Sequence, residues 1–271
     1  MLGRILIVHR RHKKGMDQLR TSSLRRNAVQ AVLEAYRKGD YAAALQAAET
    51  LQGNRNLLAP YLFFSGTMLM NLGRLEEAEQ RLRLNLTATS DDKPKALGYS
   101  SLGQLLIEMQ RYDEAVECFH TSLRYWPDRG SSHRDIAEAS LRRGSLASDS
   151  LQWAQLAVQE DRDCSRESQN GPPEIREVCN INLAEDLATL AWAVAAGSRD
   201  RAEVDRLVNE AVNLVGSASS PAALVHCHSG QAYLSLGDSA QSDRHFAEAA
   251  RIDPNGFRGR SARAMTAAVN G

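Results

Sequence analysis

Apolar residues recur along this chain at intervals of three and four, which is the spacing of one face of an α-helix. The stretch "SLGQLLIEM" places Leu102, Leu105, Leu106 and Met109 on such a face, and a second face begins after the polar break that follows. Alanine and leucine are abundant, whereas β-branched residues are sparse. Because this composition favours helices over strands, the chain is predicted to be all-α.

The helical pattern repeats. Four stretches align as one unit of two helices with a break between them: "LEAYRKGDYAAALQAA", "GTMLMNLGRLEEAEQRL", "GQLLIEMQRYDEAVECF" and "GQAYLSLGDSAQSDRHF". The breaks fall at Gly39, Gly73, Gln110, Gly144, Gly197 and Gly237. Glycine at a break can take a positive φ and end the first helix, while Gly103 and Gly230 leave room for a neighbouring helix. A single pair cannot bury its apolar faces, so about six pairs are predicted to stack.

The repeated unit resembles the tetratricopeptide repeat family. The residues that carry this resemblance in the best copy are Tyr99, Leu102, Gly103, Leu106, Tyr112, Ala115, Phe119 and Pro127. In the last clear copy they are Gly230, Tyr233, Gly237, Phe246, Ala249 and Pro254. The resemblance covers residues 22–255 and implies a right-handed α–α superhelix of about six helical pairs with a C-terminal capping helix.

Three segments lie outside the regular pattern. Residues 1–21 are a basic N-terminal arm, either a disordered tail or a segment that docks on a partner. Residues 256–271 are predicted to form the cap helix, with Arg258, Arg260 and Arg263 on a solvated face or bound to an anion. The polar insertion at 159–178 separates the fourth and fifth repeats. Two interpretations of it stay open: a helix extension, or an exposed recognition loop.

The family resemblance implies a concave groove lined by the first helix of each pair. Matching the family's positions places these groove residues here: Arg26, Tyr36, Phe63, Thr67, Met70, Ser100, Gln104, Ile107, Arg134 and Glu138. Their mixture of aromatic, apolar and polar side chains suits an extended or helical peptide. The clamp with which some family members hold a terminal carboxylate is absent, because Val29, Leu33, Phe64, Leu97 and Ser101 stand at its positions.

Charge suggests an alternative partner. The formal net charge is zero, but residues 1–38 carry +8 and the remainder carries −8. Arg10, Arg11, Lys13 and Lys14 form a candidate anion-binding arm for membrane or nucleic acid. Nucleic-acid binding by the acidic body is not expected, because its aromatic residues fall on packing positions. Self-association between the arm and another copy's body is also possible.

No catalytic, cofactor or metal motif occurs in the sequence, so neither an enzyme nor a cofactor is expected. His226 and His228 point about 200° apart on a helix and cannot chelate one ion together; His226 with His245 is a weak alternative. Cys118 and His120 diverge in the same way. The four cysteines show no metal spacing and are predicted to be free thiols; if the insertion is an exposed recognition loop, Cys164 is the most accessible of them.

The targeting signals are equally sparse. The apolar run at 5–8 is too short for a signal peptide or a membrane span. The expected location is therefore the cytoplasm, and the expected function is a non-catalytic interaction scaffold.

Overall fold

The computed structural model describes residues 23–52, 57–127, 130–145, 147–216 and 219–270. Within these ranges it contains thirteen helices and no strand. The helices are α2 (Ser23–Arg37), α3 (Tyr41–Glu49), α4 (Leu58–Asn71), α5 (Leu75–Ala88), α6 (Asp92–Glu108), α7 (Tyr112–Tyr125), α8 (Gly130–Arg143), α9 (Ala147–Ser168), α10 (Pro173–Ala196), α11 (Arg201–Val215), α12 (Ser219–Leu236), α13 (Ser239–Ile252) and α14 (Phe257–Asn270).

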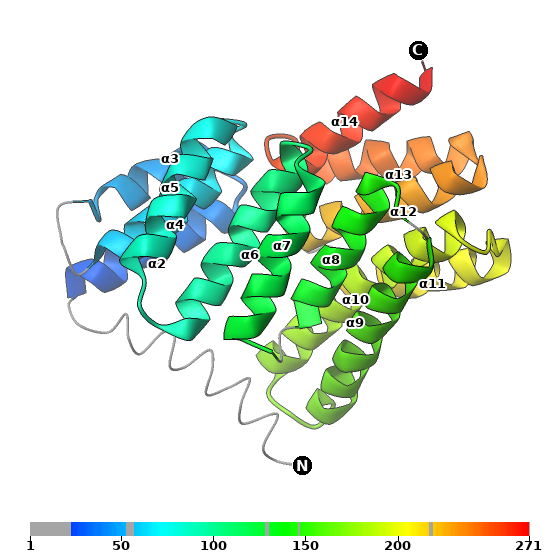
Figure 1. The fold of residues 1–271 in the computed structure, drawn as a ribbon, viewed down its shortest axis with the longest axis horizontal. Helices are drawn as coiled ribbons and strands as arrows, with labels where there is room; N and C mark the ends of the chain where they lie inside the picture. The colour runs from blue at the N-terminus through cyan, green and yellow to red at the C-terminus, as the bar shows by residue number, and fades with distance from the viewer. Residues whose placement is uncertain (1–22, 53–56, 128–129, 146, 217–218, 271) are drawn as a thin grey trace.

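Consecutive helices form six pairs, from α2–α3 to α12–α13, and α14 follows as a single C-terminal helix. Figure 1 shows the pairs stacked in chain order, with the later helices curving back behind α8 and α9. The long helix α10 is central to this curvature, because it contacts α8, α9, α11 and α12. The predicted all-α solenoid of helical pairs with a capping helix is confirmed.

Glycine and phenylalanine fix the spacing within two of the pairs. Phe119 on α7 is fully buried, and a Cβ placed on Gly103 of α6 would lie only 2.5 Å from its ring. Gly230 on α12 stands in the same relation to Phe246 on α13, at 2.6 Å. The predicted role of these two glycines is confirmed, since any side chain there would separate the helices.

The turns between the helices of a pair use a left-handed residue. Gly39, Gly73, Gly144 and Gly237 all have a positive φ, between 70° and 82°. At the fifth pair the prediction was wrong: Gly197 has φ −93°, and the left-handed residue of that turn is Arg199 at φ 57°. Because α10 ends at Ala196 and the following turn is longer, the left-handed conformation falls on Arg199, two residues after Gly197.

Gln110 occupies the same turn position in the third pair with φ 59°, a conformation in which a side chain is strained. Gln110→Gly is therefore expected to raise the free energy of unfolding by about 0.5–1 kcal/mol. Urea denaturation followed by circular dichroism measures the change. Gly39→Ala is the matched control, because no atom lies within 4 Å of its Cβ position and the backbone alone decides the result. A loss of stability in Gln110→Gly would contradict this explanation.

The insertion at 159–178 is mostly helical. Its first part continues α9 to Ser168 and its last part belongs to α10, so only residues 169–172 form the turn. This hairpin brings Cys164 and Cys179 together in a disulfide, with their Cα atoms 5.8 Å apart. The prediction of free thiols is thus wrong for these two residues, because an antiparallel helical hairpin aligns positions on either side of its turn. Two cysteines are free: Cys118 is half-buried and Cys227 is buried.

Candidate functional site: the concave face

The predicted groove residues divide into two groups by exposure. Tyr36, Phe63, Thr67 and Gln104 are partly exposed, whereas Met70, Ser100, Ile107, Arg134 and Glu138 are buried. The side chain of Arg26 lies outside the described residues, as do Arg10, Arg11, Lys13 and Lys14 of the arm. The accessible positions come from α2, α4 and α6, while the two charged positions on α8 are closed off from solvent.

Two of the accessible residues, Tyr36 and Phe63, are aromatic and belong to the first two repeats. Phe63 meets Phe64 edge to face on α4, with ring centres 5.7 Å apart, and Tyr36 on α2 meets Tyr41 at 5.8 Å. The Thr67 hydroxyl donates to the carbonyl of Phe63 one turn earlier. Phe63 is held by a ring neighbour but keeps an exposed part, so it suits an apolar anchor of a bound segment.

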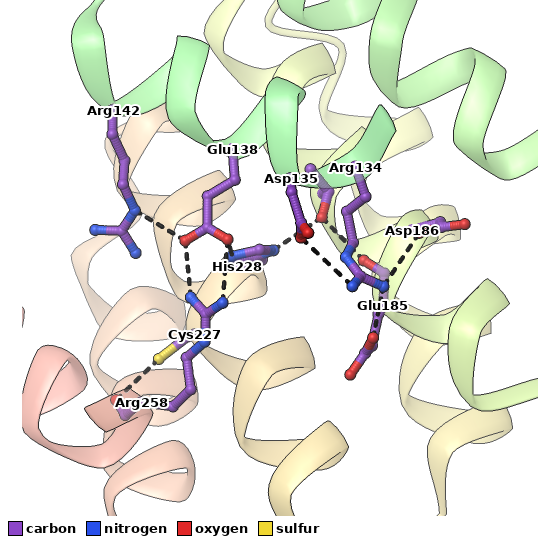
Figure 2. Close-up of polar contacts among 10 residues, drawn as sticks. Arg134, Asp135, Glu138, Arg142, Glu185, Asp186, Cys227, His228 and Arg258 are labelled. Atoms are coloured by element: carbon purple, nitrogen blue, oxygen red, sulfur yellow. Dashed lines mark hydrogen bonds and ion pairs between the residues drawn. The ribbon is translucent and has the colours of Figure 1, made fainter. Parts of the chain in front are cut away.

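Glu138 on α8 organises the closed part of the face (Figure 2). Its carboxylate accepts two hydrogen bonds from Arg258 of α14, at 2.7 and 3.1 Å, and one from Nε of Arg142 at 2.9 Å. Nε2 of His228 on α12 lies 3.3 Å from it. Burial alone would raise the pKa of Glu138, but Arg258, His228 and Arg142 hold that pKa well below its ordinary value. Glu138 therefore ties α8 to both α12 and α14.

The contacts of His228 resemble those of a catalytic relay. Its Nδ1 lies 2.9 Å from the hydroxyl of Thr189, and its Nε2 faces Glu138. Burial lowers the pKa of His228 to about 4, so the ring is neutral at pH 7. All three side chains are at most 1 % exposed. Because no substrate reaches them, this arrangement positions helices α8, α10 and α12 and does not form an active site.

Arg134 organises a second buried cluster, between α8 and α10 (Figure 2). Its guanidinium lies 2.5 Å from Glu185, 3.4 Å from Asp186 and 3.5 Å from Asp135. Burial opposes its charge, but the attraction of these carboxylates outweighs burial and raises the pKa of Arg134. Burial raises the pKa of Asp186 well above its ordinary value. Ser100 on α6 joins the cluster by donating to Asp135 at 3.3 Å.

The C-terminal segment reaches this face, which the sequence interpretation missed. The interpretation placed Arg258 and Arg260 on a solvated cap, but Arg258 is only 3 % exposed. Arg260 donates to the carbonyls of Met70, at 3.0 Å, and of Asn71. The hydroxyl of Tyr41 donates to Asp253 at 3.0 Å. The expectation failed because a superhelix with this curvature returns its last repeat to its first, and no local pattern reveals the curvature.

His226 on α12 and His245 on α13 form the histidine pair considered from the sequence. Their Nδ1 atoms lie 2.9 Å apart, and Tyr233 stacks on His245. Burial lowers the pKa of both rings, that of His245 to about 4. Near neutral pH both are uncharged, so one ring donates and the other accepts. Among the described residues, no group of three or more metal-ligating side chains is suitably placed for a metal ion.

This pair makes stability sensitive to acid. The pKa of His245 is lower in the folded state than the unfolded value of about 6.5. The contribution of this histidine to the free energy of unfolding is therefore complete above about pH 6.5 and is lost as the pH falls toward 4. Glu248 opposes and Arg251 reinforces the lowering at His226. His245→Gln is expected to reduce the stability loss between pH 7 and 4.5 by roughly 1–2 kcal/mol, allowing for screening. Urea titrations at several pH values measure the free energy of unfolding. The same pH dependence of this free energy in wild type and His245→Gln would contradict the prediction.

No helix among the described residues has the length and apolar character to cross a membrane.

Stacked helical pairs with a concave face define a helical repeat protein. Protein-family models described as tetratricopeptide repeat match residues 29–92, 101–163 and 223–255 of the sequence. The chain belongs to the tetratricopeptide repeat family.

Two solved structures illustrate what this chain is similar to. A thermophilic tetratricopeptide repeat protein of Thermus thermophilus is similar with a TM-score of 0.51 and 15 % identity, over 78 % of this chain and 98 % of that one. PilF of Pseudomonas aeruginosa is similar with a TM-score of 0.49 and 13 % identity, over 89 % and 97 % of the two chains. No curated protein sequence matches this chain.

Proposed function

We propose that this protein is a non-catalytic scaffold that binds a segment of a partner protein on the concave face of its first three repeats. The observation that carries the proposal is the division of that face. Phe63, Tyr36 and Thr67 stay partly exposed on α2 and α4, whereas the corresponding positions on α8 are buried in ion pairs. Scaffolding of this general kind is what the family's fold supports.

The chemistry of the open surface favours a partner segment with apolar anchors. Leu97 on α6 is 37 % exposed, and it lies seven residues before Gln104, on the same face of that helix. Gln104, also partly exposed, supplies a side-chain amide for the partner's backbone. A short helix or extended segment with one or two apolar side chains fits such a surface.

Affinity purification from native cells under cross-linking, followed by mass spectrometry, tests the proposal. Phe63→Ala is expected to reduce recovery of a specific partner at least about tenfold, since truncating an aromatic hot-spot residue costs about 2 kcal/mol or more. The matched control is Leu84→Ala, which truncates a 54 % exposed residue on α5, the second helix of the same pair. Equal recovery by wild type, Phe63→Ala and Leu84→Ala, all with native circular dichroism, would remove the concave face from the proposal.

The alternative function is docking on membrane or nucleic acid through Arg10, Arg11, Lys13 and Lys14, and the +8 charge of residues 1–38 supports it. These four residues lie outside the described ranges. Binding of this kind falls steeply with salt and disappears when residues 1–20 are deleted. Binding that is insensitive to both changes excludes the arm. Size-exclusion chromatography of the wild type and of the protein without residues 1–20 tests whether the arm mediates self-association.

A cytoplasmic location stays a prediction, and the disulfide between Cys164 and Cys179 weighs against it, since disulfides persist mainly in oxidising compartments. Blocking thiols at the moment of cell lysis and then counting the free cysteines decides the question. Two free thiols support an oxidising location, whereas four support the cytoplasm.

A further inference from the structure

Residues 253–260, here called the strap, connect α13 to α14 and lie against the concave face. Asp253 accepts from Tyr41 of α3, Arg258 donates to Glu138 of α8, and Arg260 donates to the carbonyls of Met70 and Asn71 at the end of α4. The strap therefore touches the first, second and fourth repeats. Glu138 is a predicted groove residue and the strap contacts its side chain, so the strap occupies part of the position expected of a ligand.

The first of two subsites beneath the strap is the carboxylate of Glu138. Arg142 and His228 fix this carboxylate, which leaves both of its oxygens directed at the guanidinium of Arg258 (Figure 2). Glu108 lies nearby and is partly exposed; burial raises its pKa, and the charges of Arg258 and Arg142 only partly offset this rise. A fixed carboxylate that receives two N–H groups in parallel selects arginine over lysine.

The second subsite is the C-terminal end of α4. The carbonyl of Met70 accepts from the backbone N–H of Gly73 and also from Arg260, and the carbonyl of Asn71 accepts from Arg260. Both carbonyls lie at the negative end of the α4 dipole, which favours a cation there. Together the subsites accept two guanidinium groups from residues two positions apart.

We propose that this surface binds an arginine-x-arginine segment of a partner protein and that the strap is the internal occupant which such a segment displaces. This inference rests on the proposed function, because the partner lies on the same concave face. Exchange is possible because most strap contacts are polar and an incoming segment reproduces them; only Phe257 adds a partly buried apolar contact. The rest of α14 stays anchored, since Ala262 and Met265 pack against Cys227 and Phe246.

A fluorescein-labelled peptide with the sequence of residues 251–264, "RIDPNGFRGRSARA", supplies the probe. It is titrated into the full chain, wild type and Arg258→Met/Arg260→Met, with fluorescence anisotropy as the readout. The expected result is binding at least tenfold tighter to the double variant, whose own strap is weakened. A control peptide with alanine at positions 258 and 260 is expected to lose that gain, and adding Glu138→Gln to the variant is expected to abolish the preference for arginine at these positions.

Equal binding to the wild type and to a folded double variant would overturn the proposal, as would equal binding of the two peptides. If the double variant does not fold, hydrogen exchange of the wild type decides. The amides of Gly256 and Arg260 are expected to exchange at least a hundredfold faster than those of α12, and equal protection would overturn the proposal. If recovery of the partner depends on Phe63 but the protein does not bind the peptide, the proposed function is supported and only this inference is wrong.

Discussion

Replacing Glu138 by alanine is expected to lower the free energy of unfolding by about 3–5 kcal/mol, because it leaves buried cations without their counter-charge. Arg258 is 3 % exposed and directs two hydrogen bonds at this carboxylate, and Nε of Arg142 directs a third. The loss falls on the contacts between α8, α12 and α14. Urea denaturation monitored by circular dichroism measures it.

Two comparisons show whether the buried charge is the cause. Glu203→Ala removes the partner of Arg206 on the surface of α11, where both side chains are well exposed, and about 0.5 kcal/mol or less is expected. In Glu138→Met/Arg258→Met, the removal of both charges is expected to recover at least half of the loss. A Glu138→Ala variant as stable as Glu203→Ala would show that water or a rearranged partner satisfies Arg258, and that α14 is not held by this pair.

The sequence predicts the repeat architecture well because its information is local. A glycine on one helix, a phenylalanine on the next and a left-handed residue between them recur at the same spacing in the third pair (Gly103, Gln110, Phe119) and the sixth pair (Gly230, Gly237, Phe246). Gln110 shows that the register of the repeat is strong enough to impose a positive φ on a residue other than glycine. Where the set weakens, as around Gly197 in the fifth pair, the predicted turn moved by two residues.

The sequence does not predict how the concave face is used, because that depends on curvature summed over all repeats. Glu138 and Arg258 are 120 residues apart, and their contact exists only if the solenoid returns on itself. The family positions were chosen on the assumption that the concave face is open. Phe63 and Thr67 are partly exposed, whereas Arg134 and Glu138 are buried by the protein's own helices.

The histidine and cysteine pairs show that the sequence predicts a contact only where the repeat fixes the spacing. His226 and His245 face each other across one helical pair, and the sequence placed them as neighbours because the repeat fixes that spacing. Cys164 and Cys179 flank a turn in the insertion, where no repeat register applies. Their pairing became visible only when α9 and α10 proved to extend through the segment interpreted as a possible loop.

Phe119→Ala is expected to destabilise the protein by about 3–5 kcal/mol, because it empties a fully buried site at the centre of the third pair. Gly103→Ala alone is expected to cost about 1–3 kcal/mol, since the new Cβ lies 2.5 Å from the Phe119 ring. In the Phe119→Ala background that clash is gone and alanine is the better helix former, so Gly103→Ala is expected to become neutral or to stabilise by up to about 1 kcal/mol. A double-mutant cycle in urea measures the reversal, and strictly additive losses would mean that this glycine does not set the helix spacing.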